Sequence, residues 1–324
     1  MIYRGTARNL ARLAKLLRAG ELVGVPTETV YGLAADAFND RACRRIFAAK
    51  GRPATDPLIV HVRGWRDLAQ VAEMNDAAKR LAEEFWPGPL TLVLRKTAAV
   101  SDVVTAGRDS VAVRAPSHPL LRRLMALAGR PLAAPSANPF GYVSPTTAAH
   151  VQRGLGARVR HILDGGPSSI GLESTIVDLR NPSKPRLLRP GKITRGEIEK
   201  ALGVIVRSGV RVGGKVRGGR VSPGQFKRHY SPHTPVVAHA RPGEGEAARS
   251  GKDEAWLFLA RPATLRGRNI FWLDPRGDLR GAGRRLFAML RRIDEGGFRR
   301  IHVELAEGPG LAEAINDRIR RAGS

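Results

Sequence analysis

Three observations predict an α/β protein of two domains. Apolar segments of strand length alternate with segments whose apolar residues recur at helical spacing, which is the pattern of a sheet covered by helices. The length of 324 residues is sufficient for two hydrophobic cores. The alternation stops after Val206 and resumes near residue 236. We therefore expect a larger domain over residues 1–206, a linker over 207–235 and a smaller α/β domain over 236–324.

The elements of the larger domain follow in order along the chain. Residues 1–20 are expected to form an amphipathic helix, with Leu10, Leu13, Leu16 and Leu17 at helical spacing and Gly20 as its stop. Buried strands are expected over residues 21–26, 57–62, 90–96, 110–116, 130–138, 161–166 and 174–180. Helices are expected over residues 40–50, 76–86, 118–129, 146–156 and 194–203. This alternation predicts an open, twisted sheet with helices packed on it.

The segment after Val206 is rich in glycine, arginine and proline, and no acidic residue occurs between Lys200 and Gly243. Residues 207–222 are therefore predicted to be a mobile basic linker that spans about 20–25 Å. Beyond it, strands are expected over residues 235–240, 254–260, 269–274 and 299–306, and helices over 279–296 and 310–323. This pattern predicts a second, smaller domain of the Rossmann-like α/β kind.

The net charge of the chain is extreme. Lysine and arginine number 55 against 29 aspartate and glutamate residues, which gives a formal charge of +26. Such a surface concentrates anions, above all nucleotides and RNA. Only ten of these cations are lysine, and a dominance of arginine also follows from base composition or from heat adaptation. The charge alone therefore leaves open both an RNA-binding protein and an enzyme that acts on a nucleotide.

Other features exclude several classes of protein. No apolar segment reaches the roughly 18–20 residues that a membrane span needs. The single cysteine, Cys43, excludes a disulfide framework and a cysteine-rich zinc site, and we interpret it as a buried helical residue. Because the N-terminus also lacks the pattern of a signal peptide, we expect a cytoplasmic protein.

Polar groups collect at four places where predicted strands end, which is where open α/β sheets hold their ligands. The first is Val25-Pro-Thr-Glu-Thr-Val-Tyr-Gly32. An extended backbone there places Thr27 and Thr29 on one face and Glu28 on the other. An ordinary strand-to-helix turn with threonine caps is the competing interpretation.

The second place, Lys50-Gly-Arg52-Pro, puts two cations before the predicted strand over residues 57–62. Each of the two prolines that follow biases the residue before it away from helix, so we expect both cations on fixed, extended backbone. Cations fixed in this way lose little entropy when they bind phosphate, and arginine binds it through two parallel hydrogen bonds. A solvated surface pair is the alternative for the cations, and a partly buried structural residue is the alternative for His61 in the strand.

The third and fourth places combine small residues, prolines and hydroxyl groups. They comprise Ala133-Ala-Pro-Ser-Ala-Asn-Pro139, Gly141 and Ser144-Pro-Thr146, and then Asp164-Gly-Gly166, Gly171-Leu-Glu-Ser-Thr-Ile176 and Leu188-Arg-Pro-Gly191. Such segments bring backbone and side-chain donors close to an anionic ligand. The G-x-x-x-x-G-K-[ST] phosphate loop and the HExxH zinc pattern are absent from the sequence. A bound nucleotide would therefore depend on dispersed cations and hydroxyl groups.

Taken together, PTETVYGL, KGRP with PLIVHV, WPGPLTLVL, SVAVRAP, APSAN, DGG, ESTIVD and LRPG resemble the YrdC-like domain family. The segment SPGQFKRHYSPHTP is similar to the one that joins this domain to a C-terminal domain in two-domain L-threonylcarbamoyladenylate synthases. The resemblance extends from about residue 20 to 235, whereas residues 236–324 match only in their α/β character. It implies a twisted open sheet with a concave basic groove, linked to a smaller Rossmann-like domain.

The resemblance also implies a reaction. L-Threonine, bicarbonate or carbon dioxide, and ATP with Mg²⁺ give threonylcarbamoyl-AMP and pyrophosphate, and a downstream threonylcarbamoyl transferase uses the product to modify tRNA beside the anticodon. The metal is expected to be held by ATP and water, since the sequence has no dedicated set of carboxylates for it. Weak binding of tRNA or other RNA is a further implied property.

The same similarity assigns roles to single residues. L-Threonine is expected to be bound by Thr29, His61, Arg114, Ala134 and Ser174. The nucleotide is expected to be bound by Arg52, Asp56, Ser110, Ser136, Asn138, Ser144, Arg189 and Tyr230, the last within a segment that folds over it. Lys50 and Arg52 are the expected catalytic residues, which stabilise charge on phosphate and carbamate. Asp56 stands where related sequences carry asparagine, and an acid near phosphates is unfavourable unless it meets a metal ion or a hydroxyl group.

Two alternatives compete with this interpretation. A non-catalytic protein that binds tRNA or double-stranded RNA agrees with the charge, but aromatic residues make up only 5% of the chain and are not interleaved with basic ones. A carbamoyltransferase of the hydrogenase-maturation type contains a related domain, but it needs cysteine-paired zinc fingers, which one cysteine cannot form.

Overall fold

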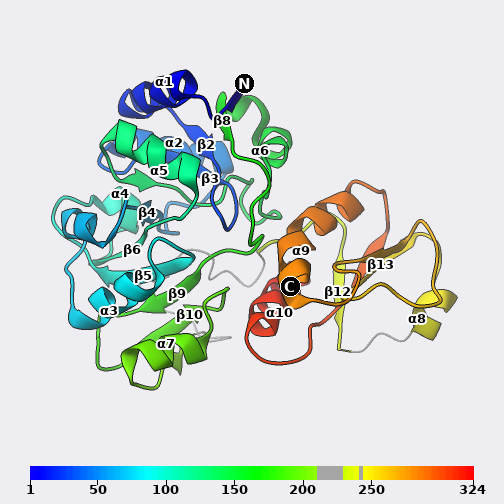
Figure 1. Cartoon of the computed structure of the whole chain (residues 1–324). Coiled ribbons are helices and arrows are strands. Elements are labelled where there is room, and N and C mark those ends of the chain that lie inside the picture. Colours follow the sequence, from blue (N-terminus) through cyan, green and yellow to red (C-terminus); the bar gives the residue numbers. More distant parts are fainter. Residues whose placement is uncertain (210–228, 241–243) are drawn as a thin grey trace.

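The computed structural model describes residues 1–209, 229–240 and 244–324. Within these ranges the chain forms two α/β units, a larger one up to Ser208 and a smaller one from Val236 onward (Figure 1). Most of the predicted mobile linker lies outside the described residues. Its first two residues form a short strand, β11 (Arg207–Ser208), which pairs in parallel with β10.

The larger unit is built on a mixed sheet with the strand order β1-β8-β2-β3-β7-β4-β6-β5-β9-β10-β11. Besides β11, its strands are β1 (Ile2–Arg4), β2 (Val23–Val25), β3 (Gly32–Asp36), β4 (Ile59–His61), β5 (Leu90–Arg95), β6 (Ser110–Arg114), β7 (Leu132–Ala133), β8 (His161–Asp164), β9 (Thr175–Asp178) and β10 (Arg186–Arg189). Strands β4, β6 and β10 run in the same direction. Their last residues, His61, Arg114 and Arg189, therefore project from the carboxyl ends of three parallel strands.

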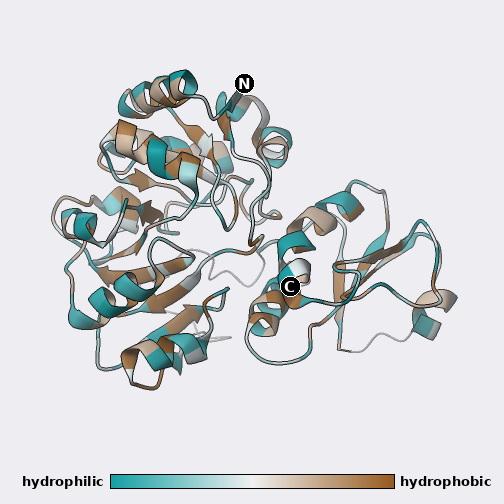
Figure 2. Cartoon of the chain, viewed as in Figure 1, coloured by the Kyte–Doolittle hydropathy of each residue, from teal (hydrophilic) through white to brown (hydrophobic). Residues whose placement is uncertain are grey.

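Helices cover this sheet on both faces (Figure 1). They are α1 (Ala7–Arg18), α2 (Asp40–Lys50), η1 (Trp65–Gln70), α3 (Asp76–Phe85), α4 (Asp102–Thr105), α5 (Pro119–Ala128), α6 (Ala148–Leu155), η2 (Gly156–Arg158) and α7 (Arg195–Leu202). Local residues set the helix ends, since Asn39 caps the start of α2 and Thr194 forms a capping box with Glu197 at the start of α7. The strands are mostly apolar in colour in Figure 2, whereas the helices carry both colours, as expected for helices with one buried face.

The start of the chain differs from the sequence prediction. The expectation of one helix over residues 1–20 is wrong for its first turn, because β1 occupies Ile2–Arg4 and pairs in parallel with β8. Helix α1 begins only after Thr6, whose hydroxyl accepts a hydrogen bond from the Asn9 amide. Strand β3 was not predicted either, because its consecutive alanines have low strand propensity. It pairs antiparallel with β2, and the loop between these two strands carries the predicted threonines.

The smaller unit confirms the predicted second domain. Its parallel strands β12 (Val236–His239), β13 (Glu254–Phe258), β14 (Ile270–Trp272) and β15 (Arg300–Glu304) lie in the order β12-β15-β13-β14. Helices α9 (Leu279–Asp294) and α10 (Leu311–Ala322) agree with the prediction, and α8 (Glu244–Arg249) is an additional short helix. None of the helices in the described ranges is long and apolar enough to cross a membrane.

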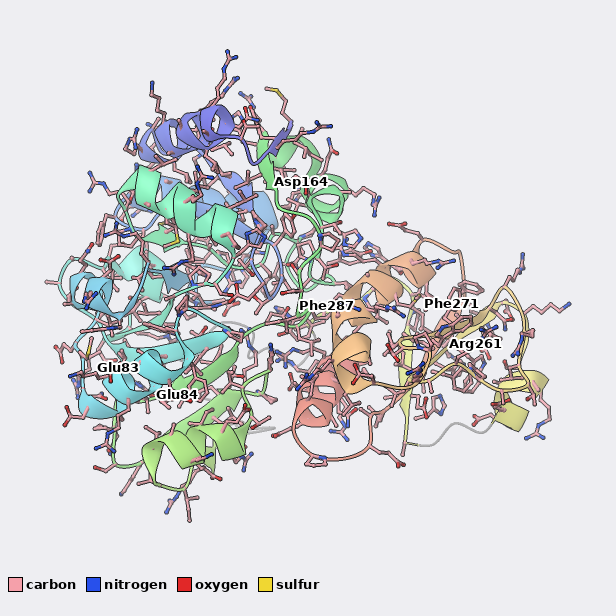
Figure 3. All side chains as sticks on the ribbon, viewed as in Figure 1. Glu83, Glu84, Asp164, Arg261, Phe271 and Phe287 are labelled. Atoms are coloured by element: carbon pink, nitrogen blue, oxygen red, sulfur yellow. The ribbon has the colours of Figure 1, made fainter. Side chains whose placement is uncertain are left out.

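Helices α9 and α10 lie against the larger unit (Figure 1). The Tyr142 hydroxyl donates to Asp294 of α9 at 2.8 Å, and Arg291 donates to the backbone carbonyl of Val143. Leu172 of the larger unit shares a hydrophobic core with Phe287, which Figure 3 places at the junction of the two units. The two units therefore meet through a packed seam of apolar and hydrogen-bonded contacts.

Gly171 is the tightest point of this seam. Its φ angle is +79°, and a Cβ atom there would lie 2.5 Å from the Cα atom of Arg284 on α9. Such a distance is far below van der Waals contact. The Cα atom of Arg284 is a backbone atom, and the added Cβ atom would be bonded directly to the backbone, so rotation of a side chain cannot separate them.

We expect Gly171→Ala to destabilise the protein by about 2–4 kcal/mol, because it adds left-handed strain to a clash with α9. Gly129→Ala is the matched control, since Gly129 has a φ of +66° and open space where the Cβ atom would be. Urea unfolding followed by circular dichroism measures both. Equal losses in the two variants would mean that the clash at the seam is relieved without penalty.

Candidate active site

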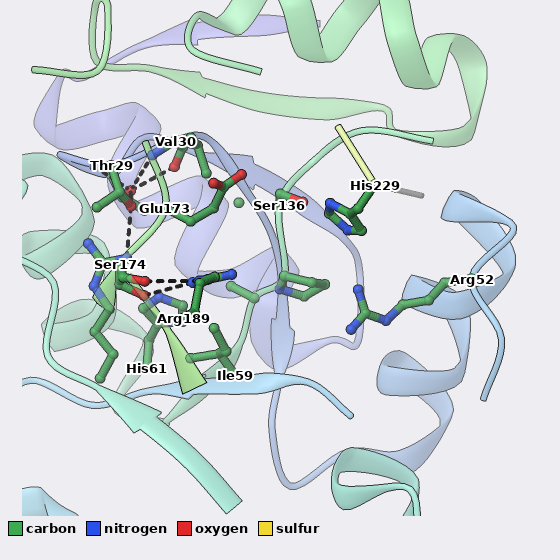
Figure 4. Close-up of a pocket in the computed structure, with 15 residues that line it drawn as sticks. Thr29, Val30, Arg52, Ile59, His61, Ser136, Glu173, Ser174, Arg189 and His229 are labelled. Carbon is green, nitrogen blue, oxygen red and sulfur yellow. Dashed lines mark hydrogen bonds between the residues drawn. The ribbon is translucent and has the colours of Figure 1, made fainter. Parts of the chain in front are cut away.

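A hollow of about 510 Å³, open to solvent, lies over the carboxyl ends of β4, β6 and β10. Of the residues predicted for the site, it is lined by Thr29, Arg52, His61, Arg114, Ala134, Ser136, Ser174 and Arg189. It is also lined by Thr27, Val30, Gly32, Ile59, Pro135, Glu173 and His229, none of which was assigned a role from the sequence. Figure 4 shows Arg52 and His229 on one side of the hollow and Thr29, Ser174 and His61 on the other.

A buried ion pair fixes the polar groups at one end of the hollow. Arg114 lies 2.7 Å from a carboxylate oxygen of Glu28, and both side chains are almost completely buried. A second nitrogen of Arg114 donates to the hydroxyl of Thr29 at 2.8 Å, and the hydroxyl groups of Thr29 and Thr27 are also 2.8 Å apart. The expected alternation of Thr27 and Thr29 opposite Glu28 thus has a clear structural purpose. Glu28 holds the guanidinium of Arg114 while the threonines face the hollow.

His61 faces the same end of the hollow and is buried. Burial, and next to it the positive charge of Arg114, lower the pKa of His61 to about 3. The ring is therefore uncharged near neutral pH. Val60, its neighbour on β4, lies in the hydrophobic core on the opposite face, as the alternation of a strand requires.

The side chain of Arg189, at the end of β10, reaches Ser174, the residue directly before β9. Its guanidinium donates to the carbonyl and to the hydroxyl of Ser174, at 3.0 Å in each case, and that hydroxyl is 2.7 Å from the hydroxyl of Thr91. Within the described residues no carboxylate lies in ion-pairing distance of Arg189. Burial lowers the pKa of its guanidinium from the ordinary value. Arg189 thus brings a cation to the hollow whose charge is not cancelled by a directly bonded acid.

Arg52 is held differently from the sequence expectation. Its guanidinium lies 2.9 Å from a carboxylate oxygen of Asp56 and donates to the backbone carbonyls of Asp56 and Pro57. Both charged side chains are buried. The guanidinium of Arg52 is thus a partner of Asp56 that the sequence did not indicate. Asp56 fixes the orientation of Arg52, which lines the hollow while Asp56 does not.

Lys50 departs further from its predicted geometry. It is the last residue of α2, so the expectation of extended backbone is wrong for it, and the left-handed Gly51 ends the helix after it. The proline effect reaches only the residue directly before each proline, which is why it applies to Arg52 and not to Lys50. The Lys50 ammonium is buried and donates to the carbonyls of Ser136 and Asn138 at 2.5 Å each. Burial, followed by the charge of Arg52, holds its pKa well below the ordinary value.

Five further predicted residues do not line the hollow. Ser110 lies at the amino end of β6, and its buried hydroxyl has no hydrogen-bond partner in the described residues. The amide nitrogen of Asn138 donates to two carbonyls of the following turn, and the hydroxyl of Ser144 donates to Glu173. Tyr230 is buried in the core of the smaller unit, and its neighbour His229 reaches the hollow instead. The fifth is Asp56, described above.

A set of protein ligands for a metal ion does not form in the described ranges, where no three His, Cys, Asp or Glu side chains gather suitably. Glu173 is the acidic side chain among the residues that line the hollow. Both of its oxygens are engaged, one by the hydroxyl of Ser144 and the other by Arg318 at 3.0 Å. These donors suit a metal ion that arrives already bound to phosphates and water better than a resident one.

Two family models match the chain. One, described as "Telomere recombination", matches residues 15–191, and the other, described as "Threonylcarbamoyl-AMP synthase, C-terminal domain", matches residues 193–324. The threonylcarbamoyl-AMP synthase of Pyrococcus abyssi is 41% identical over 95% of this chain and 92% of its own length. The chain belongs to the threonylcarbamoyl-AMP synthase family.

Further comparisons within the threonylcarbamoyl-AMP synthase family agree. The synthase of Bacillus subtilis is 38% identical over 97% of this chain and 92% of its own length. The crystal structure of P. abyssi Sua5 complexed with L-threonine matches with a TM-score of 0.91 at 38% identity, over 100% of this chain and 97% of that chain. These findings confirm the family resemblance and the fold class predicted from the sequence. The second family model begins at residue 193, before α7, so it includes the linker as well as the smaller unit.

Proposed function

We propose that this chain is a threonylcarbamoyl-AMP synthase, which converts L-threonine, bicarbonate or carbon dioxide, and MgATP into threonylcarbamoyl-AMP and pyrophosphate. The observation that carries the proposal is the hollow, in which a hydroxyl-lined end with Arg114 is continuous with the guanidinium groups of Arg189 and Arg52. An amino acid needs a cation for its carboxylate, and a triphosphate needs several. One hollow that supplies both suits a reaction that joins the two.

L-Threonine occupies the end formed by Thr29, His61, Arg114, Ala134 and Ser174. Arg114 meets its carboxylate, and little entropy is lost because Glu28 already fixes the guanidinium. His61 is uncharged at neutral pH, so it lines the site without repelling the ammonium group of the amino acid. Membership of the family and the threonine complex of P. abyssi Sua5 support this placement.

ATP occupies the opposite end, with its phosphates against Arg52, Arg189 and Ser136. Asp56 serves this end by orienting Arg52, and Lys50 by fixing the backbone between Ser136 and Asn138. Ser110, Ser144 and Tyr230 complete the expected nucleotide set as residues of its walls.

The reaction needs no nucleophilic side chain. The free amine of threonine attacks the carbon of carbon dioxide, forms a C–N bond and loses a proton to give the carbamate; bicarbonate gives the same carbamate with the breaking of a C–O bond and the loss of water. A carbamate oxygen then attacks the α-phosphorus of ATP, and the bond between this phosphorus and the bridging oxygen breaks to release pyrophosphate. The chain positions the carbamate and the α-phosphate for this attack, and its cations compensate the negative charge on the α-phosphate and on the departing pyrophosphate. Mg²⁺ enters as part of the MgATP substrate. Arg52 and Arg189 carry most of that compensation.

The parts of the chain divide these tasks. Residues 1–206 supply all the lining residues of the hollow except His229, which comes from the predicted linker region 207–235, and residues 236–324 pack behind it through α10. The product serves a downstream threonylcarbamoyl transferase that acts on tRNA, which places the enzyme in the cytoplasm. The basic surface allows weak contact with tRNA in addition.

Purified protein incubated with L-threonine, bicarbonate and radiolabelled MgATP tests the proposal. We expect pyrophosphate release that requires both threonine and bicarbonate. Serine in place of threonine controls for hydrolysis of ATP by any amino acid. Release that continues without threonine would contradict the proposed reaction. No release, together with tight, salt-sensitive binding of RNA, would support a non-catalytic RNA-binding protein instead.

A further inference from the structure

Glu173 contributes an acidic side chain to the hollow, and no step proposed above uses it. It directly precedes Ser174, on the segment that leads into β9. One carboxylate oxygen accepts a hydrogen bond from the hydroxyl of Ser144, and the other lies 3.0 Å from Nε of Arg318. A carboxylate at this place repels a triphosphate unless its charge is compensated, because the surroundings are largely shielded from water.

The compensating cation comes from the other unit. Arg318 belongs to α10, and its side chain is 0% exposed. Besides its contact with Glu173, it donates to the backbone carbonyl of Pro190 at 2.8 Å and pairs with Asp317 at 2.9 Å. Its guanidinium also lies 5.4 Å from the centre of the Tyr230 ring. A fully buried guanidinium with this many partners is a fixed part of the structure rather than a surface charge.

These contacts join two segments that carry the lining of the hollow. Glu173 precedes Ser174, Pro190 follows Arg189, and Arg189 donates to both the carbonyl and the hydroxyl of Ser174. Arg318 therefore contacts the residue before Ser174 and the residue after Arg189. In the described part of the chain, α10 is the element of the smaller unit that brings a charged side chain to a residue lining the hollow.

We propose that Arg318 is a positioning residue through which the smaller unit completes the nucleotide end of the active site. It cancels the charge of Glu173, which otherwise faces the phosphates, and holds that carboxylate in its contact with Ser144. The inference rests on the proposed function, because it requires a nucleotide to bind in this hollow. Tight binding of ATP then depends on α10 being docked, which gives the smaller unit a defined task.

Four variants of the full-length protein test this inference: Arg318→Met, Glu173→Gln, the double variant, and Arg320→Met as the matched control. Arg320 is an exposed residue of the same helix. The probe is α,β-methylene ATP with Mg²⁺, whose α–β bond is not cleaved, and its Kd is measured by calorimetry in the presence of L-threonine. The melting temperature of each variant is recorded in parallel.

We expect Arg318→Met to weaken binding of the probe at least tenfold, because the charge of Glu173 then faces the phosphates. Glu173→Gln and the double variant should bind within about threefold of the unchanged protein, since neither has that charge. Arg320→Met should have no effect. A double variant that binds as weakly as Arg318→Met would assign Arg318 a merely structural role and overturn the inference.

Three other outcomes are also decisive. If Arg318→Met does not fold, Glu173→Gln and the double variant decide alone, and a tenfold loss of binding in Glu173→Gln would overturn the inference because the nucleotide would then need the carboxylate. If the unchanged protein binds the probe but releases no pyrophosphate from ATP, the proposed function fails while the role of Arg318 stands. If the unchanged protein does not bind the probe at all, both fail.

Discussion

Arg189→Ala is expected to lower threonine-dependent pyrophosphate release by about two to three orders of magnitude. The variant removes a pre-positioned cation from the phosphates, and one such donor in a water-poor site is worth roughly that factor in rate. The fold should lose only about 1–3 kcal/mol, because the main structural consequence is a carbonyl of Ser174 without its donor. Initial rates at saturating threonine, measured beside thermal unfolding, separate the two effects.

Arg186→Ala is the matched control for this prediction. Arg186 lies on the same strand, at its other end, and is exposed. Its loss should leave the rate unchanged within about twofold, since an exposed cation away from the hollow is screened by water and salt. A rate for Arg189→Ala within tenfold of the unchanged protein would remove Arg189 from the nucleotide site.

Arg114→Met should produce the largest loss of stability among the site variants, about 3–5 kcal/mol. The substitution leaves the buried carboxylate of Glu28 without its ion-pair partner, and an uncompensated buried charge carries that penalty. Threonine binding should be lost as well, because the cation for its carboxylate is gone. Chemical denaturation measures the stability, and calorimetric titration with L-threonine measures the binding.

The double variant Arg114→Met, Glu28→Gln separates these two effects. Removal of both charges should restore most of the stability, since a neutral pair of similar volume is tolerated at such places. Threonine binding should stay lost, because no cation returns to the hollow. If the double variant bound threonine again, the guanidinium of Arg114 would be a structural group only, and the carboxylate of the amino acid would have another partner.

The sequence predicted the site best where strand geometry decides the outcome. The family resemblance assigned His61, Arg114 and Arg189 to the site, and the structure places all three at the carboxyl ends of parallel strands, where ligands of open α/β sheets lie. The prediction failed where a local rule was extended too far. Lys50 was given the extended backbone of Arg52, although it has no proline after it and ends a well-formed helix.

The contacts that cross between distant segments were beyond the reach of sequence patterns. Glu173 and Arg318 are 145 positions apart, and nothing in the local pattern of either residue indicates the other. The same holds for Tyr230, which was expected over the nucleotide and lies in the core of the smaller unit. Its ring packs against Phe287 of α9, so the tertiary contacts of the second unit decide where its side chain points.

The close approach of Gly171 to α9 has a consequence for protein engineering. A hybrid made by grafting the smaller unit of a relative onto this larger one would bring a foreign helix against a site with no room for even one extra carbon atom. Hybrids should therefore fold only when the backbone of the donor helix follows the same path beside Gly171. The donor helix also needs residues equivalent to Asp294, which accepts a hydrogen bond from Tyr142, and to Arg291, which donates to the Val143 carbonyl. Directed recombination should accordingly exchange both sides of this junction together.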